Sequence, residues 1–104
     1  MKTRISKRQK WAGELWQLHL YVAGETTKSM KALSNLTKFC ESYLKGHYRI
    51  TVIDLIAQPQ LAKCAQILAI PTVVRDQPKP TRTMIGNFSN TERLLDSLDL
   101  RATN

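Results

Sequence analysis

The first regular pattern in the chain is an alternation of apolar and polar residues from Leu15 to Val22. An apolar side chain at every second position of this segment predicts a β-strand. From Lys28 to Lys45 the apolar residues recur at steps of three and four, which predicts an amphipathic helix. Thr26 or Thr27 can cap the start of this helix, and Gly46 ends it.

The helix divides its side chains between two faces. The face expected to pack inward carries Met30, Leu33, Leu36, Cys40 and Tyr43 or Leu44, with Phe39 beside them. The outer face carries Lys28, Lys31, Lys38 and Lys45. The next segment, Tyr48 to Leu55, is apolar on both faces, which is typical of a central strand. Two strands joined by a long helix predict a right-handed parallel βαβ unit.

The second half of the chain has shorter patterns. Pro59 opens a helix over Gln60–Leu68, whose inward positions are Leu61, Cys64, Ala65 and Leu68. Brief strands at Thr72–Arg75 and Arg82–Gly86 flank a turn that contains Pro78 and Pro80. A capping box over Ser89–Glu92 begins the last helix, which buries Leu94, Leu95 and Leu98.

The element order βαβαββα predicts an α/β fold of the thioredoxin-like class. We expect one domain over residues 14–104, preceded by a flexible basic leader over residues 1–13. Pro71 lies where thioredoxin-like domains carry a cis proline that faces the redox site. The segment after the first strand, Ala23 to Thr27, contains no Cys-x-x-Cys motif. The scaffold without its redox pair favours a binding module over an oxidoreductase.

The residues that carry chemistry are sparse. Cys40 and Cys64 both fall in helical patterns and are expected to be buried apolar residues. Neither has a neighbouring histidine, and no spacing fits a metal site or a phosphate loop. Asp54 is a lone acid at a strand end, which is more often a turn residue. We therefore expect no enzymatic activity, no cofactor and no metal. No apolar run is long enough to span a membrane, and a cytoplasmic protein is expected.

The net charge of +8 is concentrated at the amino terminus. The first ten residues carry five basic residues and no acidic one. Such an arm is typical of proteins that contact an acidic surface or a nucleic acid. None of these ten residues is aromatic, so no base-stacking platform accompanies the charge. Nucleic acid is therefore the weaker alternative for a partner.

Ordered motifs extend over residues 16–100. They are Leu20–Gly24, Ser29, Ala32–Leu33, Val52–Leu55, Pro59–Ala62, Ile67–Thr72, Ile85–Gly86, Ser89–Asn90 and Leu98–Leu100. In this order they resemble the KaiB family of circadian clock proteins. The resemblance implies a regulator without catalytic activity that binds the hexameric ATPase KaiC or a KaiC-like ring. Its output would be circadian timing or stress adaptation. An alternative is a KaiB-like sensory or adaptor domain of a histidine-kinase system.

The resemblance also implies two folds for one sequence. One is the thioredoxin-like monomer that docks on KaiC, and the other is a tetramer-forming fold with a rearranged second half. Self-association as a dimer or tetramer is therefore expected. Pro71, Pro78 and Pro80 lie at the junctions of the short second-half elements. Ser97 stands two residues before Asp99, where the family pattern has glycine. Because glycine disfavours helix more than serine does, we expect Ser97 to favour the thioredoxin-like form.

Five residues are candidates for contact with the partner. By resemblance, Lys31 matches a basic helix residue that contacts KaiC, and Gln60 lies where family contacts fall. Arg49, Arg75 and Arg82 are further candidates, because each is expected at an exposed strand position. Charges of this kind mainly tune the association rate and its salt dependence.

Overall fold

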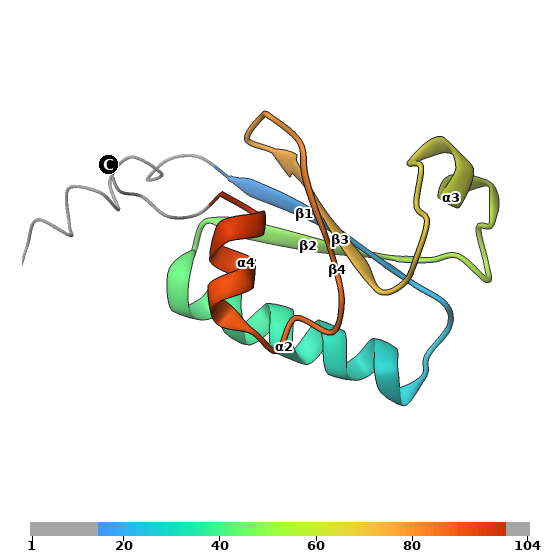
Figure 1. The fold of residues 1–104 in the computed structure, drawn as a ribbon, viewed down its shortest axis with the longest axis horizontal. Coiled ribbons are helices and arrows are strands. Elements are labelled where there is room, and N and C mark those ends of the chain that lie inside the picture. The colour runs from blue at the N-terminus through green and yellow to red at the C-terminus, as the bar shows by residue number, and fades with distance from the viewer. Residues whose placement is uncertain (1–14, 100–104) are drawn as a thin grey trace, which may run out of the picture.

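The structure, a computed structural model, describes residues 15–99. The leader expected over residues 1–13 lies outside these residues. The elements are β1 (Trp16–Val22), α2 (Thr27–Tyr43), β2 (Tyr48–Asp54), α3 (Gln60–Cys64), β3 (Thr72–Gln77), β4 (Arg82–Ile85) and α4 (Thr91–Ser97). Their order confirms the thioredoxin-like βαβαββα fold, and the alternative fold with a rearranged second half is not the one present here. Figure 1 shows α2 and α4 on the same side of the sheet.

The four strands are arranged in the order β2-β1-β3-β4. β1 pairs in parallel with β2 and antiparallel with β3, and β3 pairs antiparallel with β4. The parallel βαβ unit is confirmed, but the prediction that the second strand is central is wrong. β1 takes the central place because β3 pairs along its other side, which leaves β2 at the edge. Val52 on β2 is accordingly 47% exposed.

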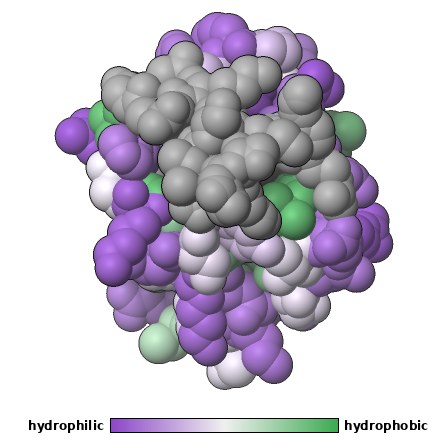
Figure 2. Space-filling view, turned by 90° about the vertical axis from the view of Figure 1, so that its left-hand side faces the viewer, coloured by the Kyte–Doolittle hydropathy of each residue, from purple (hydrophilic) through white to green (hydrophobic). Residues whose placement is uncertain are grey.

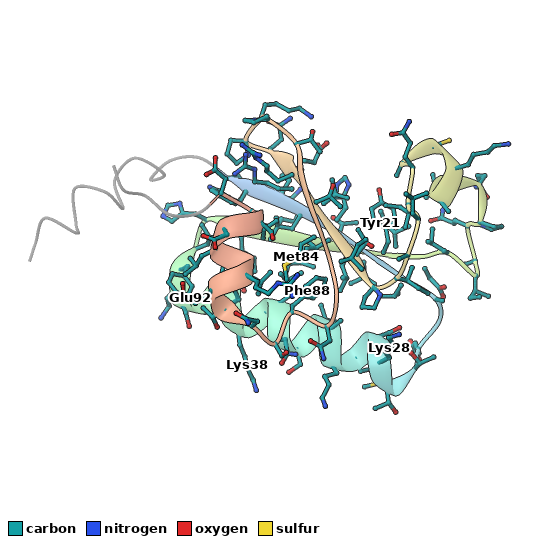
Figure 3. All side chains as sticks on the ribbon, viewed as in Figure 1. Tyr21, Lys28, Lys38, Met84, Phe88 and Glu92 are labelled. Atoms are coloured by element: carbon teal, nitrogen blue, oxygen red, sulfur yellow. The ribbon has the colours of Figure 1, made fainter. Side chains whose placement is uncertain are left out.

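The core lies between the sheet and the two helices α2 and α4. β1 supplies Trp16, Leu18, Leu20 and Val22, and one face of α2 packs against them. Figure 3 shows Met84 of β4 and Phe88 between the sheet and these helices. Leu94, Leu95 and Leu98 complete the core, as the sequence predicted.

The buried face of α2 differs in part from the predicted one. Thr26 is the N-cap and accepts a hydrogen bond from the Ser29 N–H at 3.1 Å. Leu36 and Cys40 are buried as predicted, whereas Met30 and Leu33 are exposed. The small side chain of Ala32 takes the inward position instead. The four lysines of the outer face are exposed as predicted.

Four second-half boundaries differ from the predicted ones, the smallest difference being the end of β4 at Ile85 instead of Gly86. α3 ends at Cys64 instead of Leu68, because Gln66 adopts a left-handed backbone with φ of +57°. β3 continues through Gln77 into the segment predicted as a turn. The N-cap of α4 is Asn90 and not Ser89, since the Asn90 side chain accepts from the Arg93 N–H at 3.1 Å. The peptide bonds that precede Pro71, Pro78 and Pro80 are cis.

Candidate partner-binding site

The candidate site lies where the chain leaves the carboxyl ends of the parallel strands β1 and β2. Oδ1 of Asp54 accepts hydrogen bonds from the backbone N–H groups of Gly24 and Ile56, each at 2.8 Å. The bonds from Ile56 and Gly24 stabilise the ionised carboxylate and hold the pKa of Asp54 below its ordinary value. Asp54 is thus a turn residue, as the sequence predicted, and it joins the β1–α2 loop to the β2–α3 loop.

Gly24 shows how closely these two loops approach each other. Its φ of +75° is a conformation that glycine adopts without steric cost. A Cβ at this position would lie 3.8 Å from Cγ1 of Ile56. The side chain of Ile56 therefore lies against the β1–α2 loop, yet it remains 71% exposed.

The segment from α3 to β3 presents apolar side chains to solvent at this end of the molecule. No residue of α3 is buried, and Leu68 after it is 94% exposed. Ala62, Lys63, Gln66, Ile67 and Leu68 line an open depression. Two hydrogen bonds fix the end of the segment to the sheet, from Thr72 Oγ1 to the Ala69 carbonyl (2.6 Å) and from the Gly86 N–H to the Pro71 carbonyl (3.1 Å).

We call this region the carboxyl-end surface and define it by Met30, Lys31, Ile56, Gln60, Leu68 and Ile70. All six are exposed, and Figure 1 shows the start of α2 and all of α3 at the same end of the sheet. Figure 2 views the opposite end of the molecule, where most of the visible described surface is hydrophilic. Exposed apolar side chains at one end of a molecule are typical of a protein-binding surface.

The five predicted contact residues lie in different parts of the structure. Lys31 and Gln60 both lie on the carboxyl-end surface. Arg49 and Arg82 are exposed as predicted, but they lie at the amino end of β1 and on opposite edges of the sheet. No single flat contact on the carboxyl-end surface can therefore include these two arginines.

The prediction that Arg75 is exposed is wrong, since its relative exposure is 3%. Its Nη1 donates to the Leu98 carbonyl at 2.5 Å, and its Nη2 donates to the Pro80 carbonyl at 2.6 Å. The guanidinium lies 4.9 Å from the ring centroid of Trp16. Arg75 thus joins β1, the β3–β4 turn and the end of α4, and it is a structural residue in this fold.

The two cysteines lie in different environments. Cys40 is buried as predicted, and burial, with a smaller effect of Glu41, raises the pKa of its thiol to about 12. Cys64 is exposed, which contradicts the prediction that both thiols are buried, because α3 presents it to solvent.

Among residues 15–99, no three His, Cys, Asp or Glu side chains are grouped so that they could hold a metal ion. Within the same residues, no helix has the length and apolarity that a membrane span requires.

The aliphatic residues Ile56, Leu68 and Ile70 were missed when contact residues were selected from the sequence. Leu68 was assigned to the inner face of a helix that the structure ends four residues earlier. The available signal was the apolar run Ile67 to Ile70 directly before Pro71, which is too short and too close to proline to continue a helix.

Comparison with known proteins identifies the family. The family model described as KaiB domain matches residues 19–100. The circadian clock oscillator protein KaiB of Prochlorococcus marinus strain MIT 9312 is 46% identical over 89 residues, which cover 86% of this chain and 85% of that protein. Its namesake from Thermosynechococcus vestitus is 47% identical over 83 residues, which cover 80% of this chain and 77% of that protein.

Two solved structures are similar to the fold at lower identity. The N-terminal domain of Synechococcus elongatus SasA gives a TM-score of 0.71 at 19% identity, covering 86% of this chain and 82% of that one. Mitochondrial thioredoxin 3 from Saccharomyces cerevisiae gives a TM-score of 0.63 at 20% identity, with 92% and 88% covered. They support the thioredoxin-like fold alone. On the family model and the identities above, this chain belongs to the KaiB family of circadian clock proteins.

Proposed function

We propose that this protein is a non-enzymatic regulator that binds a KaiC-like hexameric ATPase and modulates its phosphorylation or ATPase cycle. Membership of a family of circadian clock proteins supports a clock-related regulatory role. Circadian timing or stress adaptation is the proposed output, and the cytoplasm is the proposed location. The proposed partners also include a second copy of the chain, as a dimer or tetramer.

The observation that carries this proposal is the exposure of Leu68, Ile56 and Ile70 around the end of the sheet where Lys31 and Gln60 lie. Fully burying one aliphatic side chain of this size contributes about 1.5–3 kcal/mol. A few such anchors, surrounded by polar residues that exclude water, account for most of the binding energy of a typical protein interface. The carboxyl-end surface has this composition.

We expect Leu68→Asp to weaken binding to the cognate ATPase ring by about 30-fold or more, because it places a carboxylate where an apolar anchor would be buried. Biolayer interferometry with the purified ring and ATP measures the change. Leu15→Asp is the matched control, since Leu15 is also exposed (41%) but precedes β1 at the opposite end. Equal loss of binding in both variants, or in neither, would exclude the carboxyl-end surface as the contact.

We further propose that the second half of the chain changes between two folds, with Pro71, Pro78 and Pro80 at its junctions and Ser97 and Asp99 at its end. Ser97 is the last residue of α4, and Asp99, two residues later, has a left-handed φ of +57°. The short β4 and α4 support this proposal, since elements of four and seven residues depend on tertiary contacts for stability.

Ser97→Gly is expected to reduce the population of the thioredoxin-like form by about twofold, since glycine costs the helix roughly 0.5 kcal/mol more than serine. Two forms that interconvert slowly give separate sets of amide peaks in NMR spectra, and the ratio of their intensities measures the two populations. Ser34→Gly is the control, because Ser34 lies in α2 within the first half, which is proposed to be common to both folds. An unchanged peak ratio in Ser97→Gly would count against a role for Ser97.

The alternative function is a sensory or adaptor domain of a histidine-kinase signalling system. The family resemblance is the ground for this alternative, and the SasA N-terminal domain, at 19% identity, adds only that it shares the fold. Co-elution with the ATPase ring, compared with co-elution with the kinase core of the same organism, distinguishes the two functions.

A further inference from the structure

Helix α2 presents a row of lysines to solvent along its outer side. Lys28, Lys31 and Lys38 are all exposed. Helical geometry places them within about 80° of arc and along roughly 15 Å of the helix axis. Figure 3 shows Lys38 pointing away from the sheet. The row begins at the carboxyl-end surface, where Lys28 and Lys31 flank Met30 in the sequence, and extends away from it.

None of the three lysines is paired with an acidic side chain of its own helix. Glu41 is the sole acidic residue of α2, and its carboxylate accepts a hydrogen bond from the Tyr48 hydroxyl at 2.5 Å. This hydrogen bond is the main cause that raises the pKa of Tyr48 to about 12. Glu41 is therefore turned towards β2, and within residues 15–99 the three lysines form no ion pair. Their positive potential is left to attract a partner.

The chemistry of the row indicates what kind of contribution it makes. On the side of α2 that carries the row, Ser34 and Asn35 lie between Lys31 and Lys38 and offer little apolar area to bury. The exposed Leu33 lies about 160° from Lys31 around the helix and is not part of this side. Ammonium groups on flexible stems that remain in water add little to affinity, but they accelerate the encounter with an oppositely charged surface. The row therefore fits steering better than anchoring.

We propose that the lysine row of α2 steers an acidic protein surface on the ATPase ring towards the carboxyl-end surface. This inference rests on the proposed function and adds the charge of the partner and the kinetic step involved. A protein fits better than a nucleic acid, because the row leads into exposed aliphatic residues and contains no aromatic side chain on which a base could stack.

Lys38→Glu tests the inference, because Lys38 is the lysine of the row farthest from the carboxyl-end surface. Association and dissociation with the purified ring and ATP are measured at about 50 mM and about 500 mM salt. We expect the association rate constant at low salt to fall about three- to tenfold while the dissociation rate constant changes less than twofold. At high salt the difference in association rate should disappear. Lys79→Glu is the control for net charge, because Lys79 is exposed on the β3–β4 turn and already lies 3.4 Å from Asp76.

The other outcomes distinguish failure of the steering inference from failure of the proposed function. An unchanged association rate, or an increase in dissociation rate alone, overturns steering by the row. Fluorescence anisotropy with a labelled single-stranded oligonucleotide tests the nucleic acid, and tight binding that Lys38→Glu abolishes would overturn the protein partner. If the wild-type chain does not bind the ring, both the proposed function and the inference fail. If it binds, and Leu68→Asp but not Lys38→Glu changes the kinetics, only the inference fails.

Discussion

Arg75→Ala is expected to lower the free energy of unfolding by about 3–5 kcal/mol, because it removes a buried charged donor and leaves its partners unsatisfied. Leu98 is the C-cap of α4, and its carbonyl accepts a hydrogen bond from Arg75. The guanidinium at this position compensates both a carbonyl that has no partner within the helix and the negative end of the helix dipole. The Pro80 carbonyl loses its donor at the same time, and Trp16 loses the group that covers its ring. Urea denaturation followed by tryptophan fluorescence measures the change.

Arg82→Ala is the matched control for this measurement. Arg82 is the register partner of Arg75 on β4, but it is exposed and its contact with Asp99 is a surface ion pair at 3.6 Å. Such pairs contribute about 0–1 kcal/mol. Arg75→Met retains the length of the side chain without its donors, and it remains informative if Arg75→Ala does not fold. A loss in Arg75→Met no larger than that in Arg82→Ala would show that the two buried hydrogen bonds do not hold the hairpin and α4 in place.

The burial of Arg75 could not be predicted from the sequence. Strand alternation places Arg75 on the same face as Val73, which is fully buried. The prediction of an exposed Arg75 agrees instead with the usual rule that arginine remains at the surface. Two backbone carbonyls from segments distant in the sequence, Pro80 and Leu98, satisfy the guanidinium, and a single sequence contains no record of that convergence.

Long periodic segments were predicted well because many side chains contribute to one signal. β1 and α2 were found within two residues at each boundary, since their patterns extend over 7 and 17 residues. α3 was overextended because an apolar run can be read as either helix or loop when it is only a few residues long. The edge position of β2 was missed because strand order depends on the antiparallel pairing of β3 with β1, which is a long-range contact.

The candidate site was predicted only in its polar part. Lys31 and Gln60 were identified by resemblance, and the structure places both at one end of the sheet. Met30 and Leu68 of the same surface were assigned to buried helix faces, because the hydrophobic pattern cannot distinguish an apolar side chain that packs inside its own chain from one that binds a partner. Ile56 and Ile70 were assigned to neither the core nor the contact. Leu94 and Leu68 are the clearest pair of this kind, with relative exposures of 0% and 94%.

Leu94→Ala is expected to lower the free energy of unfolding by about 3 kcal/mol, within the roughly 2–5 kcal/mol range for a fully buried leucine. The truncation leaves a cavity between α4 and the sheet, and a helix of seven residues has little intrinsic stability to offset it. Leu68→Ala makes the same chemical change at the most exposed leucine among residues 15–99, and we expect it to alter stability by less than about 0.5 kcal/mol. Urea titrations of the two variants measure both changes.

The same pair of variants connects stability to binding. If Leu68 is an interface anchor, Leu68→Ala should weaken binding to the ATPase ring by about tenfold without altering the free chain, whereas Leu94→Ala should act on binding only through the fraction folded. Adding a stabilising osmolyte separates the two causes, since it should restore binding to Leu94→Ala and not to Leu68→Ala. Loss of stability in Leu68→Ala comparable to that in Leu94→Ala would mean that Leu68 packs within the chain in solution, and the carboxyl-end surface would then lose its main anchor.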